Sequence, residues 1–516
     1  MKILIPAAGQ SQRFSARGFS LPKMFLEVNG AMMIEQVIKM FDEKDEFLIL
    51  VNEMVFEKYD SEIQYIQAMN RSVRILPVEI HSKGPGYTLY RDEVRAFVDT
   101  SPFLISYCDF LVEWNYQSYK RHLESENPAG DIVSFKGFHP ASFGDTKFAY
   151  LKVFKDEVLE VREKESFTDI RQEEFASTGI YFFDSWERFE SAYRRLDENL
   201  GASTERYISL VYNFLDFQEK KITHFPVKKF ICLGTPEDYE EFCFWSHYFK
   251  LSRKFQPHFQ VEVDIAVIPM AGEGQRFRDV GYRLPKALIP INGKPMFIRT
   301  LETLPKPKQT VLITRENLVE RIETEFFNSF PGMNLTTRHF EGSTGGPGET
   351  LLLFLRDFQN SRTLTVSSCD YEHHFDGSKF RGLIENLEID GIVFTSRYSR
   401  FRMKNPNAFA YCKLDSDGFI SKIIEKETIS DNPENDPLVT GTFWFRRGFD
   451  LVNCLTQAVN VDRRINGEIY VGNSINVLIE AGKKFVVFDV INWVSFGDPF
   501  ELEIYHYWLE FFQFTE

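Results

Sequence analysis

The chain has 516 residues, of which 43% are hydrophobic and 26% charged, and its formal net charge is −15. This is an ordinary globular composition, and the negative charge argues against broad binding to nucleic acid or to an anionic membrane. The six cysteines show no C-x-x-C spacing, which favours a reduced, cytoplasmic protein. No apolar run approaches the ~18–20 residues of a membrane-spanning helix, and the N-terminus lacks a signal-peptide pattern.

Short apolar runs alternate with segments of helical spacing along the first half of the chain, which predicts βαβ units and a mostly parallel mixed sheet flanked by helices. Strands are expected at Ile3–Pro6, Phe47–Val51, Phe103–Tyr107, Ile132–Phe135 and Gly179–Phe183, with a hairpin at Phe148–Phe154 and Val158–Arg162. Helices are expected at Met32–Met40, Tyr87–Val98, Asp184–Leu196 and Thr204–Leu215.

The first strand runs into a small-residue turn, Ala7-Ala8-Gly9, which is followed by Arg13 and by the pair Pro22-Lys23. A strand that ends at a glycine turn carrying cations is typical of phosphate sites in α/β proteins, because backbone N–H groups face the anion and the cations neutralise it. Ligands of open α/β sheets bind at the carboxyl ends of the strands. We therefore expect Gly84 and Asp109, which follow strands, to converge on the same crevice.

The second half repeats the first at a separation of 261–263 residues. Gly9, Arg13 and Lys23 recur as Gly272, Arg276 and Lys286. The other recurring pairs are Gly84 and Gly346, Thr88 and Thr350, Asp109 and Asp370, Glu163-Lys164 and Glu425-Lys426, Gly179 and Gly441, and Glu205 and Glu468. Such constant spacing indicates a tandem duplication. We expect two domains, at 1–252 and 263–516, joined by a polar linker at 253–262.

The predicted elements recur in the second half as well, with strands or hairpin strands around Phe394, Ala408–Leu414 and Gly441–Phe445 and a helix at Glu468–Ile479. Each half closes with an aromatic-rich segment of helical spacing, Pro236–Leu251 and Pro499–Phe514. Packing on its own domain or between the domains is the first interpretation of these segments. A face for a homo-oligomer is the alternative.

In both halves the order of motifs resembles the sugar-phosphate nucleotidyltransferases, also called nucleoside-diphosphate-sugar pyrophosphorylases. The motifs of the first half are A-A-G-x-S-x-R-F, P-K, G-P-G-x-T-L, C-D-F, E-K, S-T-G-I-Y-F-F and L-G-T-P-E-D. The second half follows the same order and ends in F-G-D-P-F-E. The resemblance implies two tandem Rossmann-like nucleotidyltransferase domains. It also implies an enzyme that uses Mg²⁺, a nucleoside triphosphate and a sugar phosphate or related alcohol phosphate, and that releases pyrophosphate.

The resemblance assigns each recurring residue a role. A guanidinium can hold two oxygens, so Arg13 and Arg276 suit the triphosphate and the leaving pyrophosphate, while Lys23 and Lys286 suit the α-phosphate. Nucleotide-binding roles fall on Ala8, Gly9, Gly84, Thr88, Gly272, Gly274, Gly346 and Thr350. Asp109 and Asp370 would bind Mg²⁺, which takes one or two carboxylates together with phosphate oxygens. Contacts to the sugar phosphate fall on Glu163, Lys164, Gly179, Glu205, Glu425, Lys426, Gly441 and Glu468.

Several positions depart from the family pattern. Cys232 and Ser495 stand where the family often carries a second metal-binding aspartate, so one Asp and the phosphates, or another acid such as Glu205 or Glu468, would hold the metal. Ser11 replaces the second loop glycine in the first half, and Thr204 replaces the glycine that precedes the pocket glutamate. The change in the glycine loop concerns the choice of nucleotide more than the class of reaction.

We expect a cytoplasmic tandem nucleotidyltransferase that supplies precursors of bacterial surface polysaccharide or capsule. One alternative is a protein with one catalytic domain and one regulatory nucleotide-sugar-binding domain. Another is a degenerate, non-catalytic nucleotide-sugar-binding protein. A glycosyltransferase of similar fold would need a D-x-D metal motif, which the sequences CDF and CDY do not supply.

Overall fold

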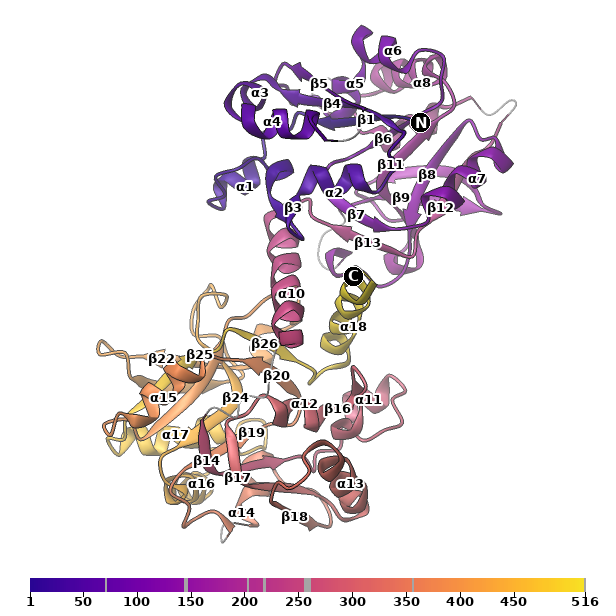
Figure 1. The fold of residues 1–516 in the computed structure, drawn as a ribbon. Helices are drawn as coiled ribbons and strands as arrows, with labels where there is room; N and C mark the ends of the chain where they lie inside the picture. The colour runs from indigo at the N-terminus through magenta and orange to yellow at the C-terminus, as the bar shows by residue number, and fades with distance from the viewer. Residues whose placement is uncertain are drawn as a thin grey trace. The chain divides into compact units, whose positions relative to one another are not determined.

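The computed structural model describes residues 1–69, 72–142, 147–201, 204–216, 220–254, 261–354 and 357–514. The chain divides into two compact units, Met1–His247 and Tyr248–Phe514. The division falls inside the long helix α10 (Pro236–Lys254). Residues 255–260 of the expected linker lie outside the described part of the chain. Figure 1 shows an α/β arrangement in each unit, with helices packed on a central sheet.

The first unit is built on a nine-stranded mixed sheet. Four neighbouring strands are parallel, and β11 then runs antiparallel to both of its neighbours, β6 and β8. In spatial order the strands are β5 (Ser72–Val78), β4 (Glu46–Asn52), β1 (Lys2–Ala7), β6 (Phe103–Ser106), β11 (Phe175–Phe183), β8 (Gly130–Phe135), β12 (Ile222–Pro226), β10 (Glu157–Glu163) and β9 (Ala149–Phe154).

Seven strands of the second unit's sheet follow the same order as the first seven strands of the first sheet. Its central path is β18 (Leu335–Phe340), β17 (Lys306–Arg315), β14 (Glu262–Pro269), β19 (Leu364–Ser367), β24 (Leu438–Phe445), β21 (Gly391–Ser396) and β25 (Phe485–Asp489). The hairpin of β22 (Ala410–Leu414) and β23 (Ile420–Glu425) is attached through β24. Each strand therefore has a counterpart in the first unit, and the expected hairpins are confirmed in both.

The first strand of each sheet is buried on both faces, which explains its continuous apolar run. Ile3 and Ile5 pack into a core that includes residues of α2 (Met33–Lys39) and α4 (Asp60–Gln67), whereas Leu4 points to a core with α6 (Asp92–Val98) and α8 (Trp186–Asn199). In the second unit the corresponding cores involve α12 (Met296–Glu302) and α13 (Val319–Ser329) on one face, and α14 (Pro347–Leu352), α16 (Gly448–Asn460) and α17 (Val471–Glu480) on the other.

Smaller elements complete the units. Short strand pairs are formed by β2 (Glu27–Val28) with β3 (Ala31–Met32), β7 (Phe110–Glu113) with β13 (Lys229–Cys232), β15 (Pro290–Ile291) with β16 (Lys294–Pro295), and β20 (Tyr371–His374) with β26 (Asn492–Ser495). The remaining helices are α1 (Gln12–Ala16), α3 (Glu53–Lys58), α5 (Pro85–Leu89), α7 (Tyr116–Glu126), α9 (Ile208–Val211), α11 (Gln275–Asp279), α15 (Gly377–Glu385) and α18 (Pro499–Phe514). No helix of the described residues is long and apolar enough to cross a bilayer.

Two segments that the sequence predicts as continuous helices are not continuous helices in the structure. The segment Tyr87–Val98 is divided into α5 and α6, because Arg91 is extended (φ −158°) and its Nε donates to the Thr88 carbonyl at the end of α5. The segment Thr204–Leu215 becomes helical only at Ile208. By contrast, the closing helix Pro499–Phe514 is confirmed, and its aromatic rings pack on Tyr248 and Phe249 within the same unit.

Candidate active sites

The glycine loops lie between the first strand and a five-residue helix, α1 or α11. The residue before each helix is left-handed, with φ 51° at Ser11 and 64° at Gly274. Ser11 Oγ accepts the backbone N–H of Lys23 at 3.2 Å, while a Cβ at Gly274 would lie 3.0 Å from the Cβ of Lys286. Serine in one unit and glycine in the other therefore form the same local turn, which packs against Lys23 or Lys286.

A lysine–aspartate pair stands beside each loop. Lys23 Nζ lies 2.6 Å from Asp109 Oδ2, and Lys286 Nζ lies 2.5 Å from Asp370 Oδ2. Burial disfavours the ammonium charge, but the neighbouring carboxylate outweighs it and raises the pKa of both lysines. Each lysine is therefore a fixed positive charge at neutral pH, held where β1 and β6, or β14 and β19, end side by side.

The turns around Gly84 and Gly346 need glycine for packing. Both residues have positive φ, 88° and 95°. A Cβ would lie 2.8 Å from the Arg206 nitrogen in one unit and 2.9 Å from the Glu468 Cβ in the other. The close neighbour of each turn is thus the segment that carries Glu205 or Glu468, which lies directly against the Gly84 or Gly346 turn.

The Glu-Lys pairs end the strands β10 and β23. Lys164 and Lys426 are both left-handed, with φ 58° and 59°, a conformation that costs a non-glycine residue ~1–2 kcal/mol. Lys164 Nζ donates to the Tyr207 hydroxyl at 2.6 Å, and Lys426 Nζ donates to the Ala408 carbonyl. Burial raises the pKa of Glu425 to about 7 and lowers the pKa of Lys426.

Gly179 and Gly441 lie where strands β11 and β24 shift register. Their φ values are 99° and 96°. A Cβ at Gly179 would lie 3.0 Å from the Tyr107 ring, and one at Gly441 would lie 3.0 Å from Ser368 Oγ. Only glycine meets both requirements without strain.

A cavity of ≈310 Å³ brings together seven of the first unit's expected residues: Ala8, Gly9, Lys23, Gly84, Thr88, Asp109 and Glu205. Arg13, which is exposed, and Glu163, Lys164 and Gly179 are not part of its lining. Lys164 nevertheless reaches the lining residue Tyr207. This cavity covers the glycine loop, the turn at Gly84 and the strand-end aspartate Asp109.

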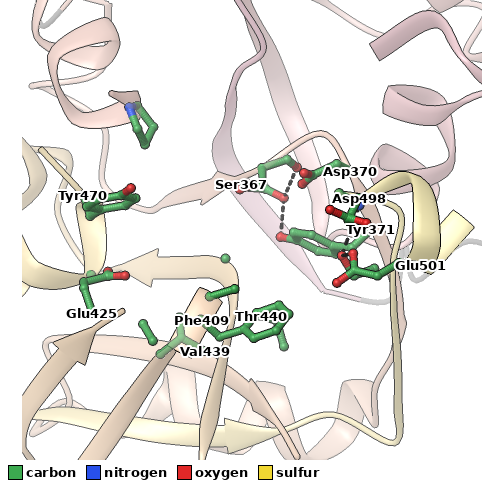
Figure 2. A pocket seen from close by; sticks show the side chains of 18 of the residues that line it. Ser367, Asp370, Tyr371, Phe409, Glu425, Val439, Thr440, Tyr470, Asp498 and Glu501 are labelled. Carbon is green, nitrogen blue, oxygen red and sulfur yellow. Dashed lines mark hydrogen bonds between the residues drawn. The ribbon is translucent and has the colours of Figure 1, made fainter. Parts of the chain in front are cut away.

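The second unit has a cavity of ≈300 Å³ that brings together Arg276, Lys286, Asp370, Glu425, Lys426 and Gly441. Gly272, Gly274, Gly346, Thr350 and Glu468 lie outside its lining. Figure 2 shows Asp370, Asp498 and Glu501 gathered at one end, and Glu425 and Tyr470 at the other. Arg276 is mostly exposed and forms an ion pair with Asp498 at 3.4 Å. This cavity covers the region expected to hold the acceptor.

Other acids stand near the positions that lack the second aspartate. Ser495 Oγ donates to Glu501 Oε2 at 2.6 Å, and Cys232 Sγ lies 3.5 Å from Asp238 Oδ2. Burial, with Asp498 and Asp370 nearby, raises the pKa of Glu501 to about 7. No set of three or more His, Cys, Asp or Glu side chains in the described ranges forms a preformed metal centre. A divalent cation would therefore rely on Asp109 or Asp370 and on phosphate oxygens, as Mg²⁺ sites commonly do.

Sequence reasoning missed several cavity residues. Tyr207, Tyr470 and Glu501 line the cavities, and the repeat spacing could have revealed them, because Tyr207 and Tyr470 are separated by 263 residues, as are Asp238 and Glu501. The second cavity is also lined by Trp493, Lys404 and Phe500. No repeated motif indicates these residues, because only the folding of the chain brings them to the cavity.

Comparison with known proteins finds one family model that matches a part of the second unit. Residues 266–406 match the model of the MobA-like NTP transferase domain. "Bifunctional protein GlmU" from Methanocaldococcus jannaschii is 24% identical over 238 residues, which cover 46% of this chain and 52% of that protein. The protein of the same name from Methanococcus maripaludis is 24% identical over 241 residues, which again cover 46% of this chain and 52% of that protein. The chain thus spans about half the length of the curated relatives it matches.

Solved structures also resemble parts of the chain. A nucleoside-diphosphate-sugar pyrophosphorylase from Vibrio cholerae RC9 covers 47% of this chain and 99% of its own, with 21% identity and a TM-score of 0.40. The inositol-1-phosphate CTP transferase from T. maritima covers 50% of this chain and 97% of its own, with 16% identity and a TM-score of 0.37.

Proposed function

We propose that this chain belongs to the sugar-phosphate nucleotidyltransferases and that each of its units joins a nucleoside triphosphate to a sugar phosphate or related alcohol phosphate. The observation that carries this proposal is the lysine–aspartate pair beside a glycine loop, which occurs with the same geometry in both units. Such a pair offers one fixed cation for phosphate and one carboxylate for a metal at the same point of the sheet.

In the proposed reaction a phosphate oxygen of the acceptor attacks the α-phosphorus. A new P–O bond forms as the bond to the β-phosphate oxygen breaks, and pyrophosphate departs with the electron pair. Negative charge grows on the non-bridging and leaving oxygens, so fixed cations lower the barrier. Lys23 and Lys286 would serve the α-phosphate, while the exposed Arg13 and Arg276 would reach the departing phosphates. Bound Mg²⁺ would neutralise charge on the triphosphate.

The acceptor would lie between the Glu-Lys pair and the metal-side aspartate. In the second unit Glu425 has a pKa of about 7, so its protonated form can donate a hydrogen bond to a hydroxyl of the acceptor. Lys426 would contact the acceptor phosphate after releasing the Ala408 carbonyl. Gly441 keeps the strand backbone accessible beside them.

The matching strand orders support a tandem arrangement of nucleotidyltransferase domains at 1–252 and 263–516, joined by residues 253–262. We place this activity in the cytoplasm, in the supply of activated precursors for bacterial surface polysaccharide. Mg²⁺ is the proposed metal because the available ligands are carboxylate and phosphate oxygens, which suit a hard cation.

A second candidate is a division of labour, with one catalytic unit and one that binds nucleotide sugar. It is favoured by the different positions of the two cavities, one over the nucleotide turn and the other over the acceptor region.

The test is a matrix of triphosphates against sugar 1-phosphates and alcohol phosphates, measured as pyrophosphate release. Lys23→Ala and Lys286→Ala variants are then assayed on the productive pair. Partial loss from each variant indicates two active units, and total loss from only one indicates a single catalytic unit. Absence of metal-dependent pyrophosphate release across the matrix would overturn the proposal.

A further inference from the structure

The second unit has a charged cavity beside its glycine loop. It measures ≈570 Å³, and its lining includes Glu273, Arg315, Glu341 and Ser343. Arg315 Nε donates to the Ala271 carbonyl at 2.9 Å, and its Nη2 lies 3.2 Å from Glu273 Oε1. Glu273 also pairs with Arg278 at 2.7 Å. The loop thus carries a carboxylate held in place by two guanidinium groups.

Two of these charged groups have uncharged counterparts in the first unit. Gln10 takes the place of Glu273, and Asn52 takes the place of Arg315, each 263 residues earlier. Asn52 Nδ2 donates to the Ala8 and Gly9 carbonyls at 3.3 and 3.5 Å, and its Oδ1 accepts from the Val55 N–H. Asn52 therefore supports the loop as Arg315 does, but it brings no carboxylate with it.

An imidazole replaces a hydroxymethyl group at the nucleotide turn. His81 lines the first unit's cavity, whereas Ser343 is its counterpart 262 residues later. His81 Nδ1 accepts the Lys83 N–H at 3.2 Å, so Nε2 carries the proton and donates to Thr88 Oγ1 at 3.0 Å. Both ring nitrogens are engaged, and the half-buried ring forms a fixed wall of the cavity.

We infer that the two units select different nucleobases, and that the second unit prefers a base with an exocyclic amino group. This inference rests on the proposed function. An ionised carboxylate only accepts hydrogen bonds, so Glu273, which has no acidic counterpart in the first unit, favours a base that presents amino N–H groups over uracil or thymine. The first unit offers amide and hydroxyl groups, which can donate to a carbonyl-bearing base, and it confines the base against the His81 ring.

Matched double variants of the full chain separate the units. Arg13→Ala/Lys23→Ala removes the cations of the first unit, and Arg276→Ala/Lys286→Ala removes those of the second. Binding of ATP, GTP, CTP, UTP and dTTP with Mg²⁺ is measured by calorimetry, which requires no acceptor. The expected result is a different order of affinities in the two variants, with amino-bearing bases favoured at least tenfold when only the second unit is intact.

Exchange of the loop residue tests the cause. In the variant that retains the second unit, Glu273→Gln should reduce the preference for amino-bearing bases about tenfold. Gln10→Glu in the matched variant should shift preference the opposite way. The same order of affinities in both units, or no effect of Glu273→Gln, overturns the inference while leaving the proposed function intact. Failure of both units to bind any triphosphate overturns the two together.

Discussion

Lys286 occupies one carboxylate oxygen of Asp370, the residue proposed to bind a divalent cation. The distance of 2.5 Å from Lys286 Nζ to Asp370 Oδ2, and side-chain exposures of 23% and 22%, define a tight and largely desolvated pair. A metal that binds before the nucleotide competes with the Lys286 ammonium for this carboxylate. Hydrogen bonds to charged groups contribute ~1.5–3 kcal/mol, and every 1.4 kcal/mol is a factor of ten in affinity. Lys286→Met should therefore tighten metal binding to the nucleotide-free protein by about 10–100-fold.

The assay is a Mn²⁺ titration followed by electron paramagnetic resonance without nucleotide. Lys23→Met should behave in the same way because the first unit has the equivalent contact at 2.6 Å. Lys286→Arg retains the positive charge and serves as the control, with little gain expected. Unchanged or weaker Mn²⁺ binding by Lys286→Met, in a variant with wild-type thermal unfolding, would refute this reasoning.

Three further predictions follow from the site geometry. Asp109→Asn combined with Asp370→Asn should abolish pyrophosphate release with every triphosphate, and retained turnover would contradict the metal assignment. Gly179→Ala should lower stability by ~1–3 kcal/mol through positive φ and the Tyr107 contact, whereas Gly9→Ala, with nothing within 4 Å, should leave the melting temperature unchanged while weakening nucleotide binding in calorimetry. Burial raises the pKa of Glu501 to about 7 from 4.5, so its folded form binds a proton more tightly than its unfolded form and stability falls as the pH rises between these values. Glu501→Gln should remove up to ~3 kcal/mol of this loss. The free energy of unfolding is measured with urea at pH 5.5 and 8, and an equal change between the two pH values in variant and wild type would contradict the prediction.

The sequence predicts the order of elements well because each unit is built from patterns that local physics decides. The apolar runs that become β1 and β14, and the closing helix Pro499–Phe514, could be located from periodicity alone. The break between α5 and α6 could not, because it depends on a side-chain bond from Arg91 to a backbone carbonyl.

The site was less accessible to sequence reasoning where it depends on packing between segments far apart in the chain. The strand-end aspartates and loop lysines are recognisable in motifs, but their direct pairing requires the parallel alignment of neighbouring strands. The acid beside Ser495 is Glu501, the last residue of the motif F-G-D-P-F-E, but the motif alone does not indicate that this carboxylate folds back to the preceding strand.

The left-handed backbone at Lys164 and Lys426 has a consequence for how such a duplicated protein can change with time. Glycine adopts this conformation without strain, so replacing either lysine by glycine would relieve local strain while discarding the cation. A unit that no longer needed the lysine for catalysis could therefore become more stable by accepting glycine at that position. Both copies still carry the strained lysine, as the proposal of two active units predicts.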